Sequence, residues 1–326
     1  MESNIVLADK RDIFATGAIR LPTIIVAADE HASRRFIEFF TANIRNRNTR
    51  QAYAHAIGRF LNWCEANRLS LDTLEPVAIA AYIEQLMTVQ SAPAVKQHLA
   101  AIKMLLDWLV VGQVLPFNPA ASVRGPRHVV KKGKTLVLSA GQARQLLDSI
   151  DLTTLVGLRD RALIGAMVYS FARVSAVINM SVEDYWQNGK RWWLRLHEKG
   201  GKYHEVPAHH NAEEYVDAYL HVAGIAGEAK TPLFRSANGS TDTLTSRRMS
   251  RGDVWHMIRR RAVKAGLPAR TCCHTFRATG ITDYLENGGT IEKAQTIAAH
   301  ESPRTTKLYD RTSDEITLDE IERIRI

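Results

Sequence analysis

The sequence predicts a mainly α-helical protein with two domains and a small β-hairpin or sheet in the second domain. Apolar residues recur at helical spacing through residues 30–109. Much later, residues 191–196 alternate between apolar and polar side chains, and the chain returns over residues 204–207 after a Gly-Gly turn, as in a hairpin. A short basic connector separates the two patterns. With 326 residues and 45% hydrophobic content, each domain can bury its own core.

Four helices are predicted within residues 29–122. The first covers Glu30–Asn43, the second begins at the cap residue Asn48, the third covers residues 72–87 and the fourth begins at Pro93. The second helix has the clearest apolar stripe. Its positions i, i+4, i+7, i+8 and i+11 are Tyr53, Ile57, Phe60, Leu61 and Cys64.

The net charge of +9 is concentrated in the connector. Residues 123–135 contribute +5 with no acid, whereas residues 1–122 and 136–326 contribute only +1 and +3. Such a density of positive charge between two domains favours a bound polyanion, although a solvated linker is the alternative interpretation. The candidate DNA contacts here are Lys131, Lys132 and Lys134.

A second basic cluster lies in the first domain. Residues 31–60 contain six arginines and one acid, Glu38. For any single arginine a solvated helix face is the simpler interpretation, and contact of the whole cluster with phosphate is favoured by the family resemblance described below. The candidate DNA contacts are Arg34, Arg35, Arg47 and Arg50.

A third basic segment, residues 247–264, is predicted to form an amphipathic helix. It contains seven Lys and Arg against the single acid Asp253. Its apolar face is slight and is needed for packing, which favours DNA over a membrane surface as the partner. The candidate DNA contacts are Arg247, Arg248 and Arg251.

Residues suited to phosphate chemistry gather near the end of the chain. His274 and Arg277 are three residues apart, so on a helix they would share one face and could address one anion together. Ser302 and Pro303 have the character of an N-cap and a first helical residue, and the short helix that follows would hold Tyr309 in place. A positioned tyrosine hydroxyl can act as a nucleophile.

Two helices are predicted upstream, over residues 138–150 and 158–170. The second ends just before Arg173, which stands among the apolar residues Phe171 and Val174. An arginine in such surroundings must be paired with an acid or directed at a ligand. A salt-bridged structural role is the simpler interpretation for this residue taken alone.

Together these segments resemble the tyrosine recombinases, the phage-integrase family of site-specific DNA recombinases. The resemblance rests on HTFR (residues 274–277), AHESPRTTKLY (299–309), FARVS (171–175) and EKGGK (198–202). It covers nearly the whole chain and is specific as a set. The chain departs from the family pattern where Phe171 replaces a glycine, where Ala176 replaces an acid three residues after Arg173, and where Ala299 replaces the glycine before His300.

The resemblance implies a domain organisation. Residues 1–28 would form an N-terminal arm, residues 29–122 a SAM-like helical core-binding domain, residues 123–135 a basic linker and residues 136–311 the catalytic domain. Residues 312–326 would form a C-terminal tail. The tail either packs on its own domain or docks on a neighbouring subunit.

The resemblance also implies an activity. The enzyme would cleave and rejoin double-stranded DNA through a 3'-phosphotyrosine intermediate, as a tetramer on DNA, with no metal, ATP or other cofactor. Lys199 would be the general acid, with Lys202 as the alternate. The implied catalytic residues are Arg173, Lys199, His274, Arg277, His300 and Tyr309.

The cysteines and the hydropathy indicate the compartment in which the protein works. Cys64, Cys272 and Cys273 do not form a disulfide framework, which favours a reducing compartment. A zinc site at Cys272, Cys273 and His274 is disfavoured because the ligands are too close together in sequence and lack a second pair. No stretch approaches the length of a membrane span, so we expect a soluble, cytoplasmic protein with no membrane partner.

Two other functions remain open at this stage. A type IB-like topoisomerase would use the same phosphotyrosine chemistry to relax DNA. A DNA-binding regulator would retain the motif without activity, as the departures at Phe171 and Ala176 would allow.

Overall fold

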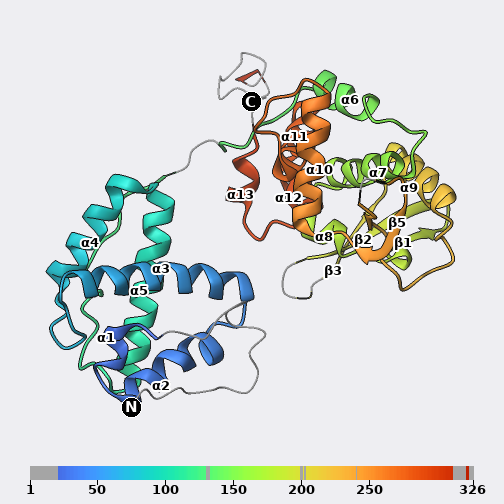
Figure 1. The fold of residues 1–326 in the computed structure, drawn as a ribbon. Helices are drawn as coiled ribbons and strands as arrows, with labels where there is room; N and C mark the ends of the chain where they lie inside the picture. Colours follow the sequence, from blue (N-terminus) through green and yellow to red (C-terminus); the bar gives the residue numbers. More distant parts are fainter. Residues whose placement is uncertain are drawn as a thin grey trace. The chain divides into compact units, whose positions relative to one another are not determined.

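The computed structural model describes residues 21–129, 133–198, 201, 203–239, 241–310 and 321–322, which fold into the helices and small sheets drawn in Figure 1. The chain divides into two compact units. Unit 1 is Met1–Val129 and unit 2 is Val130–Ile326. The fold class is the predicted one, mainly helical with small antiparallel sheets.

Unit 1 is built from helices alone in its described part. The four predicted helices are present, and a π-helical turn extends the first of them. The elements are α1 (Thr23–Val26), α2 (Glu30–Glu38), η1 (Phe39–Asn43), α3 (Arg47–Ala66), α4 (Pro76–Val89) and α5 (Ala92–Val111).

Local sequence signals explain where these helices begin. The Asp29 carboxylate accepts a hydrogen bond from the Ala32 N–H at the start of α2, and Asn46 caps α3 through the Asn48 and Thr49 N–H groups. The cap of α3 therefore lies two residues before the predicted Asn48. Proline stands in the first turn of α4 and α5, where its missing N–H is of no consequence.

The core of unit 1 is apolar and continuous. It includes Phe39, Phe60 and Ile83, and the predicted stripe of α3 faces it. The short helix α1 adds Ile24 and Ile25, both buried. The core of unit 1 thus includes residues that the sequence had placed in the N-terminal arm.

Unit 2 surrounds a central helix, α7, with further helices and two small sheets. The elements are α6 (Ala140–Asp148), α7 (Leu155–Tyr169), α8 (Val174–Ile178), η2 (Val182–Asp184), β1 (Tyr185–Asn188), β2 (Arg191–His197), β3 (Tyr203–Pro207), α9 (His210–Ala223), β4 (Arg235–Ala237), β5 (Leu244–Arg248), α10 (Arg251–Lys264), α11 (Cys273–Glu286), α12 (Ile291–Ile297) and α13 (Pro303–Lys307).

The predicted hairpin is present as β2 and β3, and β1 adds a third antiparallel strand in the order β1-β2-β3. Leu194 lies opposite Val206, and both are buried. The alternation along β2 puts Leu194 and Leu196 into the core, as expected for a sheet with one buried face. The pair β4 and β5 forms a separate two-stranded sheet.

The prediction of one helix over residues 247–264 is wrong at its start. Arg247 and Arg248 belong to strand β5, and α10 begins only at Arg251. Ser250 and Asp253 form a capping box at that point, which fixes the N-terminus of the helix. The basic composition did not predict the boundary between β5 and α10, because a run of arginines carries little information about secondary structure.

A small apolar cluster of unit 2 lies apart from its main core. It contains Phe171, Ile281, Leu285, Ala294 and Ala298, with Tyr309 packed against it. Residues from α11, α12 and the segment before α8 therefore meet here. None of the helices in the described ranges combines the length and hydropathy needed to cross a bilayer.

Candidate active site

Arg277 is the buried centre of the candidate site. It lies in the second turn of α11, and its side chain is almost fully buried. One guanidinium nitrogen donates to the Phe171 carbonyl and another donates to the Ala298 carbonyl at 2.6 Å. The side chain thus joins α11 to two other segments, one of which lies more than 100 residues earlier in the sequence.

The electrostatics of Arg277 identify its charged neighbours. Burial, and after it the positive charge of Arg173, lower the pKa of Arg277 to about 10. The side chains of Tyr309 and Glu198 act in the opposite direction and raise this pKa. Arg173, Tyr309 and Glu198 therefore all lie close enough to influence the Arg277 guanidinium.

Arg173 precedes α8 as its N-cap residue and is partly exposed. The chain reaches it through Phe171, whose φ of +53° lies in the left-handed region that favours glycine. The Phe171 ring packs in the small cluster and approaches Gly280 of α11, where an added Cβ would meet the Val168 carbonyl and the Phe171 ring. Gly280 therefore allows the close approach that holds Phe171 in this conformation.

His300 is buried beside Arg277. The residue before it, Ala299, also has a left-handed φ, +47°, where the family pattern has glycine. The His300 Nδ1 lies 2.9 Å from the Thr306 Oγ1. Burial lowers the pKa of His300 to about 3, and the charges of Arg277 and Arg173 act in the same direction. His300 is therefore neutral at physiological pH.

Tyr309 follows directly on α13, whose N-cap is Ser302 and whose first residue is Pro303. The Tyr309 ring stacks on the His300 ring, with the centroids 5.8 Å apart and the planes 6° from parallel. The Tyr309 carbonyl accepts a hydrogen bond from the Thr282 hydroxyl at 2.8 Å. The tyrosine is thus held beside Arg277 and His300 of its own chain.

His274 lies one helical turn before Arg277 on α11 and is exposed at the surface. Its pKa is lowered by partial desolvation first, then by the charges of Arg277, Arg173 and Arg251. The predicted pair of α11 residues therefore shares one face, and Arg251 of α10 adds a further cation beside it. The site brings together five of the six predicted catalytic residues.

The sixth, Lys199, and its alternate, Lys202, lie outside the described residues. The adjacent residue, Glu198, is described, and its carboxylate accepts a hydrogen bond from the Arg173 Nη1 at 2.7 Å. The sequence analysis assigned no role to Glu198. Its position beside Lys199 in the EKGGK motif was the available signal.

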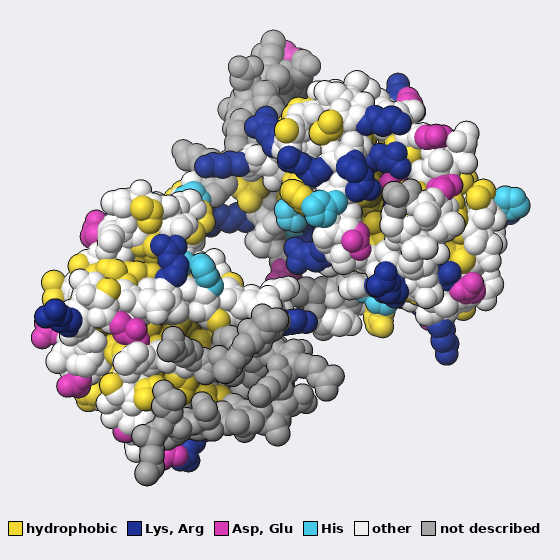
Figure 2. All heavy atoms as spheres, viewed as in Figure 1, with side chains coloured by type: hydrophobic (Ala, Val, Ile, Leu, Met, Phe, Trp, Pro, Cys, Tyr) yellow, Lys and Arg dark blue, Asp and Glu magenta, His cyan; other side chains and the backbone are white. Residues whose placement is uncertain are grey.

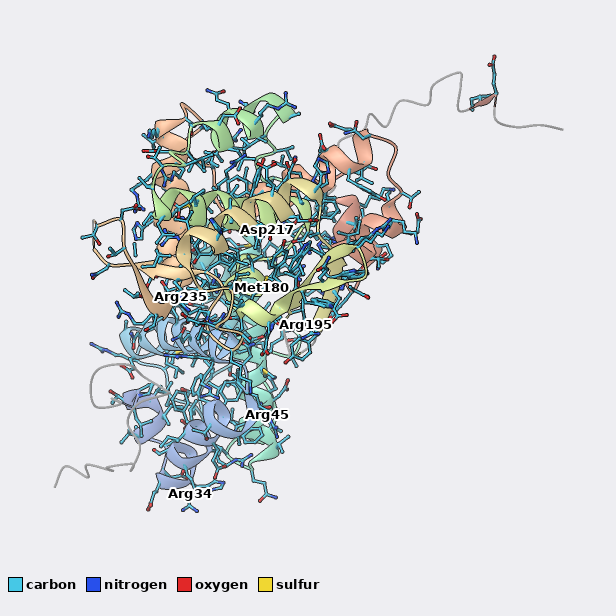
Figure 3. All side chains as sticks on the ribbon, turned by 90° about the vertical axis from the view of Figure 1, so that its right-hand side faces the viewer. Arg34, Arg45, Met180, Arg195, Asp217 and Arg235 are labelled. Atoms are coloured by element: carbon cyan, nitrogen blue, oxygen red, sulfur yellow. The ribbon has the colours of Figure 1, made fainter. Side chains whose placement is uncertain are left out.

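The predicted DNA contacts of unit 1 divide into two groups. Arg34, Arg45 and Arg47 are exposed, and Figure 3 labels Arg34 and Arg45 at two separate places in this unit. Arg50 is half-buried and donates to the Ile44 carbonyl at 3.0 Å. Arg35 instead makes internal contacts, because its guanidinium lies 4.2 Å from the Trp108 ring centroid and pairs with Glu38 at 2.7 Å.

The predicted DNA contacts of unit 2 divide in the same way. Arg247, Arg251 and Lys134 are exposed, and Figure 2 shows Lys, Arg and His side chains gathered over α10 and α11 on the viewed face. Arg248 is turned inward and donates to the Ile178 and Met180 carbonyls, both at 2.6 Å. Lys131 and Lys132 lie outside the described residues.

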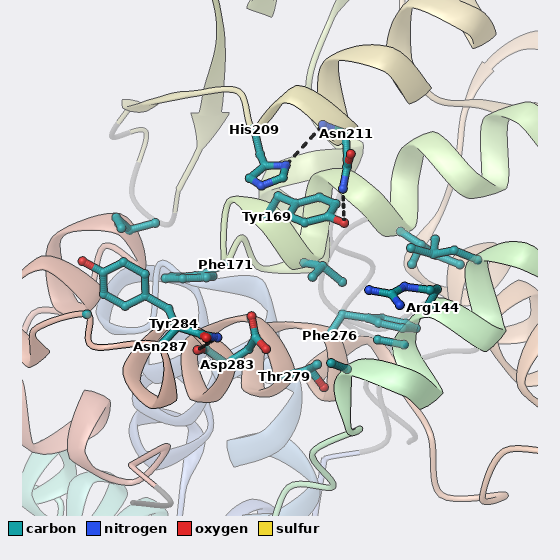
Figure 4. Close-up of a pocket in the computed structure, with 18 of the residues that line it drawn as sticks. Arg144, Tyr169, Phe171, His209, Asn211, Phe276, Thr279, Asp283, Tyr284 and Asn287 are labelled. Atoms are coloured by element: carbon teal, nitrogen blue, oxygen red, sulfur yellow. Dashed lines mark hydrogen bonds between the residues drawn. The ribbon is translucent and has the colours of Figure 1, made fainter.

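A cavity of about 710 Å³ lies on the other face of α11, between α6, α7 and the start of α9 (Figure 4). Phe276 and Tyr284 line it, and the Tyr169 hydroxyl on its wall accepts a hydrogen bond from Asn211 at 2.9 Å. Phe171 lines the cavity with its side chain and binds Arg277 through its carbonyl. The cavity and the candidate site therefore share one residue.

The three cysteines are free, and Cys64 is buried in unit 1. In the described ranges, no three His, Cys, Asp or Glu side chains come close enough to hold a metal ion. The Cys272, Cys273 and His274 run therefore does not assemble a metal site with other described residues.

Comparison with known proteins agrees with this arrangement. The phage integrase family matches residues 137–315, and the N-terminal SAM-like domain of phage integrases matches residues 33–114. The tyrosine recombinase XerC of Chlamydia muridarum is 30% identical over 251 residues, which cover 76% of this chain and 76% of that protein.

Two solved structures have a similar fold. The XerH site-specific recombinase bound to its difH substrate, in a pre-cleavage complex, aligns with a TM-score of 0.67 at 15% identity, over 93% of this chain and 95% of that one. A lambda integrase tetramer bound to a Holliday junction aligns with the same TM-score, 0.67, at 16% identity, over 92% of this chain and 85% of that one. On the family match and the XerC relationship, the chain belongs to the phage integrase family, the DNA strand-exchanging tyrosine recombinases.

Proposed function

We propose that this protein is a site-specific DNA recombinase or integrase that cleaves and rejoins DNA through a covalent 3'-phosphotyrosine intermediate. The observation that carries the proposal is the stacking of Tyr309 on the neutral His300 beside the buried Arg277. A phenol, a neutral imidazole and two guanidinium groups around one point suit the transfer of a phosphoryl group.

In the proposed first step, the Tyr309 hydroxyl oxygen attacks the phosphorus of a DNA phosphodiester. A bond forms between phosphorus and the tyrosine oxygen, and the bond to the 5'-oxygen breaks. The phenolic proton passes to His274, and Lys199 protonates the departing 5'-oxygen. The intermediate keeps the energy of the phosphodiester bond, so a 5'-hydroxyl from a second strand can reverse the step and join the strands without ATP.

The transition state carries extra negative charge on the non-bridging phosphate oxygens. Arg277 and Arg173 supply fixed positive charge and planar sets of N–H donors for these oxygens. The Nδ1 of His300 is engaged with the Thr306 hydroxyl, and in the tautomer where Nδ1 accepts, its Nε2–H is a donor for the phosphate. A lowered pKa keeps His300 in this neutral form.

We propose that cations on both units bind DNA. The exposed candidates are Arg34 and Arg47 in unit 1 and Lys134, Arg247 and Arg251 in unit 2. The half-buried Arg50 and the linker residues Lys131 and Lys132 are further candidates. Arg35 and Arg248 are left out because their guanidinium groups are used inside the protein. Contacts of this kind fix position on the duplex and make binding depend on salt.

The proposed assembly is a tetramer that acts on DNA in the cytoplasm. Residues 123–135 would form the linker, and the tail, residues 312–326, would dock on a neighbouring subunit. The lambda integrase tetramer on a junction supports this stoichiometry by likeness of fold alone. A chain truncated after Arg311 is expected to cleave a single site but to exchange strands poorly. Full exchange by the truncated chain, measured on paired DNA sites, would assign the tail to its own subunit.

The test of the chemistry is a nicked DNA substrate that loses its short 5'-hydroxyl strand after cleavage and so traps the covalent adduct. The wild-type chain should form a slowly migrating protein–DNA band in denaturing gels, and Tyr309→Phe should form none while binding DNA as before. Tyr203→Phe is the matched control, because Tyr203 is an exposed tyrosine of the same unit. It should form the adduct at the wild-type rate.

Other outcomes would select the alternatives. Equal DNA binding without adduct from the wild-type chain would indicate a DNA-binding regulator. Adduct formation together with relaxation of supercoiled DNA, but without exchange between two sites, would indicate a type IB-like topoisomerase.

A further inference from the structure

Arg173 lacks an acidic partner on its own helix. The residue one turn later in α8 is Ala176, which is fully buried and carries no charge, although the sequence motif around Arg173 ordinarily has an acid there. A partly exposed arginine without a partner samples many rotamers, and it loses this conformational entropy when it binds a phosphate. The orientation of Arg173 therefore has to come from elsewhere in the fold.

The structure supplies an acid from the sheet. The Glu198 carboxylate, directly after β2, accepts a hydrogen bond from the Arg173 Nη1 at 2.7 Å. Its side chain is only 9% exposed, whereas that of Arg173 is 37% exposed. The acid is therefore shielded, and the arginine reaches from it towards the open side of the site. A shielded pair holds its geometry better than a fully exposed one.

The backbone that carries Glu198 is itself fixed. The preceding residue, His197, pairs with Tyr203 of β3, and its Nε2 lies 2.7 Å from the carboxylate of the buried Asp184. Asp184 also accepts a hydrogen bond from the Ser181 N–H at 2.8 Å. The end of β2 is thus anchored from two sides, so Glu198 can act as a fixed partner for the partly exposed arginine.

We propose that Glu198 is a positioning residue that orients Arg173 for the phosphate and replaces the acid absent at position 176. It holds one terminal guanidinium nitrogen and leaves the rest of the fork for the ligand. The proposal rests on the proposed function, because it assumes that Arg173 binds the phosphate that Tyr309 attacks. It also implies that the first residue of the EKGGK segment helps to position an arginine that binds the phosphate.

Single-turnover cleavage of the trapping substrate tests this role. Glu198→Ala and Glu198→Gln should lower the rate of adduct formation by up to about 100-fold, the range expected when a reacting group is misplaced. Glu198→Asp keeps the charge and should recover part of the rate. DNA affinity should stay within a few-fold of wild type, because one positioned contact among many phosphate contacts is affected.

Glu205→Gln is the matched control. Glu205 lies in the same sheet and pairs with an arginine, Arg195, at 2.9 Å, but neither belongs to the candidate site. This variant should cleave at the wild-type rate. A loss equal to that of Glu198→Gln would show that any broken ion pair of the sheet has the same effect, and the proposal would be wrong.

A double-mutant cycle separates positioning from a general loss of structure. In an Arg173→Ala background, adding Glu198→Gln should cause no further loss, because the residue through which Glu198 acts is gone. Full additivity of the two losses would overturn the proposal.

A substrate with sulfur in place of the departing 5'-oxygen decides between Arg173 and Lys199 as the residue that Glu198 serves. Sulfur leaves without being protonated, so this substrate should restore cleavage by Lys199→Ala. It should not restore cleavage by Glu198→Gln, because the defect of this variant is the misplaced Arg173. Restoration of both variants to the same degree would assign Glu198 to the leaving group instead and contradict the proposal.

The proposed function and the role of Glu198 can be tested separately. If the wild-type chain forms no adduct, the proposed function itself fails. If the wild-type chain forms the adduct and Glu198→Gln forms it equally fast, only the role of Glu198 fails.

Discussion

Among the described residues of unit 2, Arg159 and Arg277 are almost fully buried, and their hydrogen-bond partners differ. Arg159 donates to the buried Asp160 carboxylate at 2.6 and 3.0 Å, and Arg261 donates to the same carboxylate at 2.8 and 3.0 Å. Arg277, in the described structure, donates to two backbone carbonyls and lies near a second arginine, Arg173.

The difference separates a structural charge from a functional one. Arg159 pairs directly with the Asp160 carboxylate, which it shares with Arg261, so its charged donors are engaged inside the fold. Carbonyl groups fix the direction of Arg277 without cancelling its charge, and the nearby acid Glu198 pairs with Arg173, so Arg277 itself hydrogen-bonds to no carboxylate among the described residues. An anion such as a DNA phosphate would supply that partner. The comparison therefore assigns stability to one site and chemistry to the other.

Asp160→Asn is expected to have the largest effect, and on stability. Both Arg159 and Arg261 would lose their carboxylate, and breaking a buried pair costs about 3–5 kcal/mol. Urea denaturation of the full chain should show this loss in the transition of unit 2. Arg161 lies on the same helix, α7, and pairs with the exposed Glu214 of α9. Glu214→Gln removes this partner and should leave the transition almost unchanged. Equal losses in the two variants would remove the distinction drawn for Asp160.

Arg277→Lys should have the opposite profile. A lysine keeps a positive charge but lacks the planar fork, so the rate of adduct formation should fall about 10²- to 10³-fold. The unfolding free energy should change much less than in Asp160→Asn. Arg195→Lys, at an arginine outside the site, is the control for the substitution itself. Normal cleavage by Arg277→Lys would mean that the buried guanidinium has only a structural role.

The pH dependence of cleavage tests the effect of the two arginines directly. Burial first, and then the charges of Arg277 and Arg173, lower the pKa of His300 to about 3, and the same causes lower the pKa of His274 below its usual range. His300 therefore stays neutral between pH 7.5 and 6, and any decline of the cleavage rate from protonation of His274 should begin at a lower pH than for an ordinary histidine. The rate is measured at limiting DNA concentration, where it reports the free enzyme. A steep decline centred near pH 6.5 would show that the arginines do not act on these imidazoles.

Thr306→Val should have the smallest effect. The valine removes the hydroxyl beside the His300 Nδ1 but keeps the shape of the side chain, and one hydrogen bond is worth about 0.5–1.5 kcal/mol. A decrease of about two- to tenfold in the cleavage rate is expected. Thr306→Ser keeps the hydroxyl and should cleave at nearly the wild-type rate. If both variants slow cleavage equally, the methyl contact rather than the hydrogen bond is what matters.

Much of the fold could be predicted because its signals are local. The helix starts at Asp29, Ser139 and Ser302 follow from capping residues and proline within one turn. The hairpin of β2 and β3 follows from alternation around a glycine turn. Composition failed where it was the only guide, as at Arg247 and Arg248, because a basic run is compatible with a strand as well as a helix.

The candidate site was predicted as a set of residues but not as a geometry. The order of the motifs named Arg173, His274, Arg277, His300 and Tyr309. It did not indicate that Tyr309 stacks on His300, since the two rings meet only through the packing of α12 and α13 on α11.

The sequence by itself determined the helices, the hairpin, the family and the chemical character of the site residues, because periodicity, caps and motifs act within a few residues of one another. The tertiary structure alone decided which charges are compensated. The Arg35 and Arg248 side chains are engaged inside the protein, and Arg173 pairs with Glu198, 25 residues away and directly after strand β2. Such pairings depend on how whole elements pack, and no local pattern encodes them.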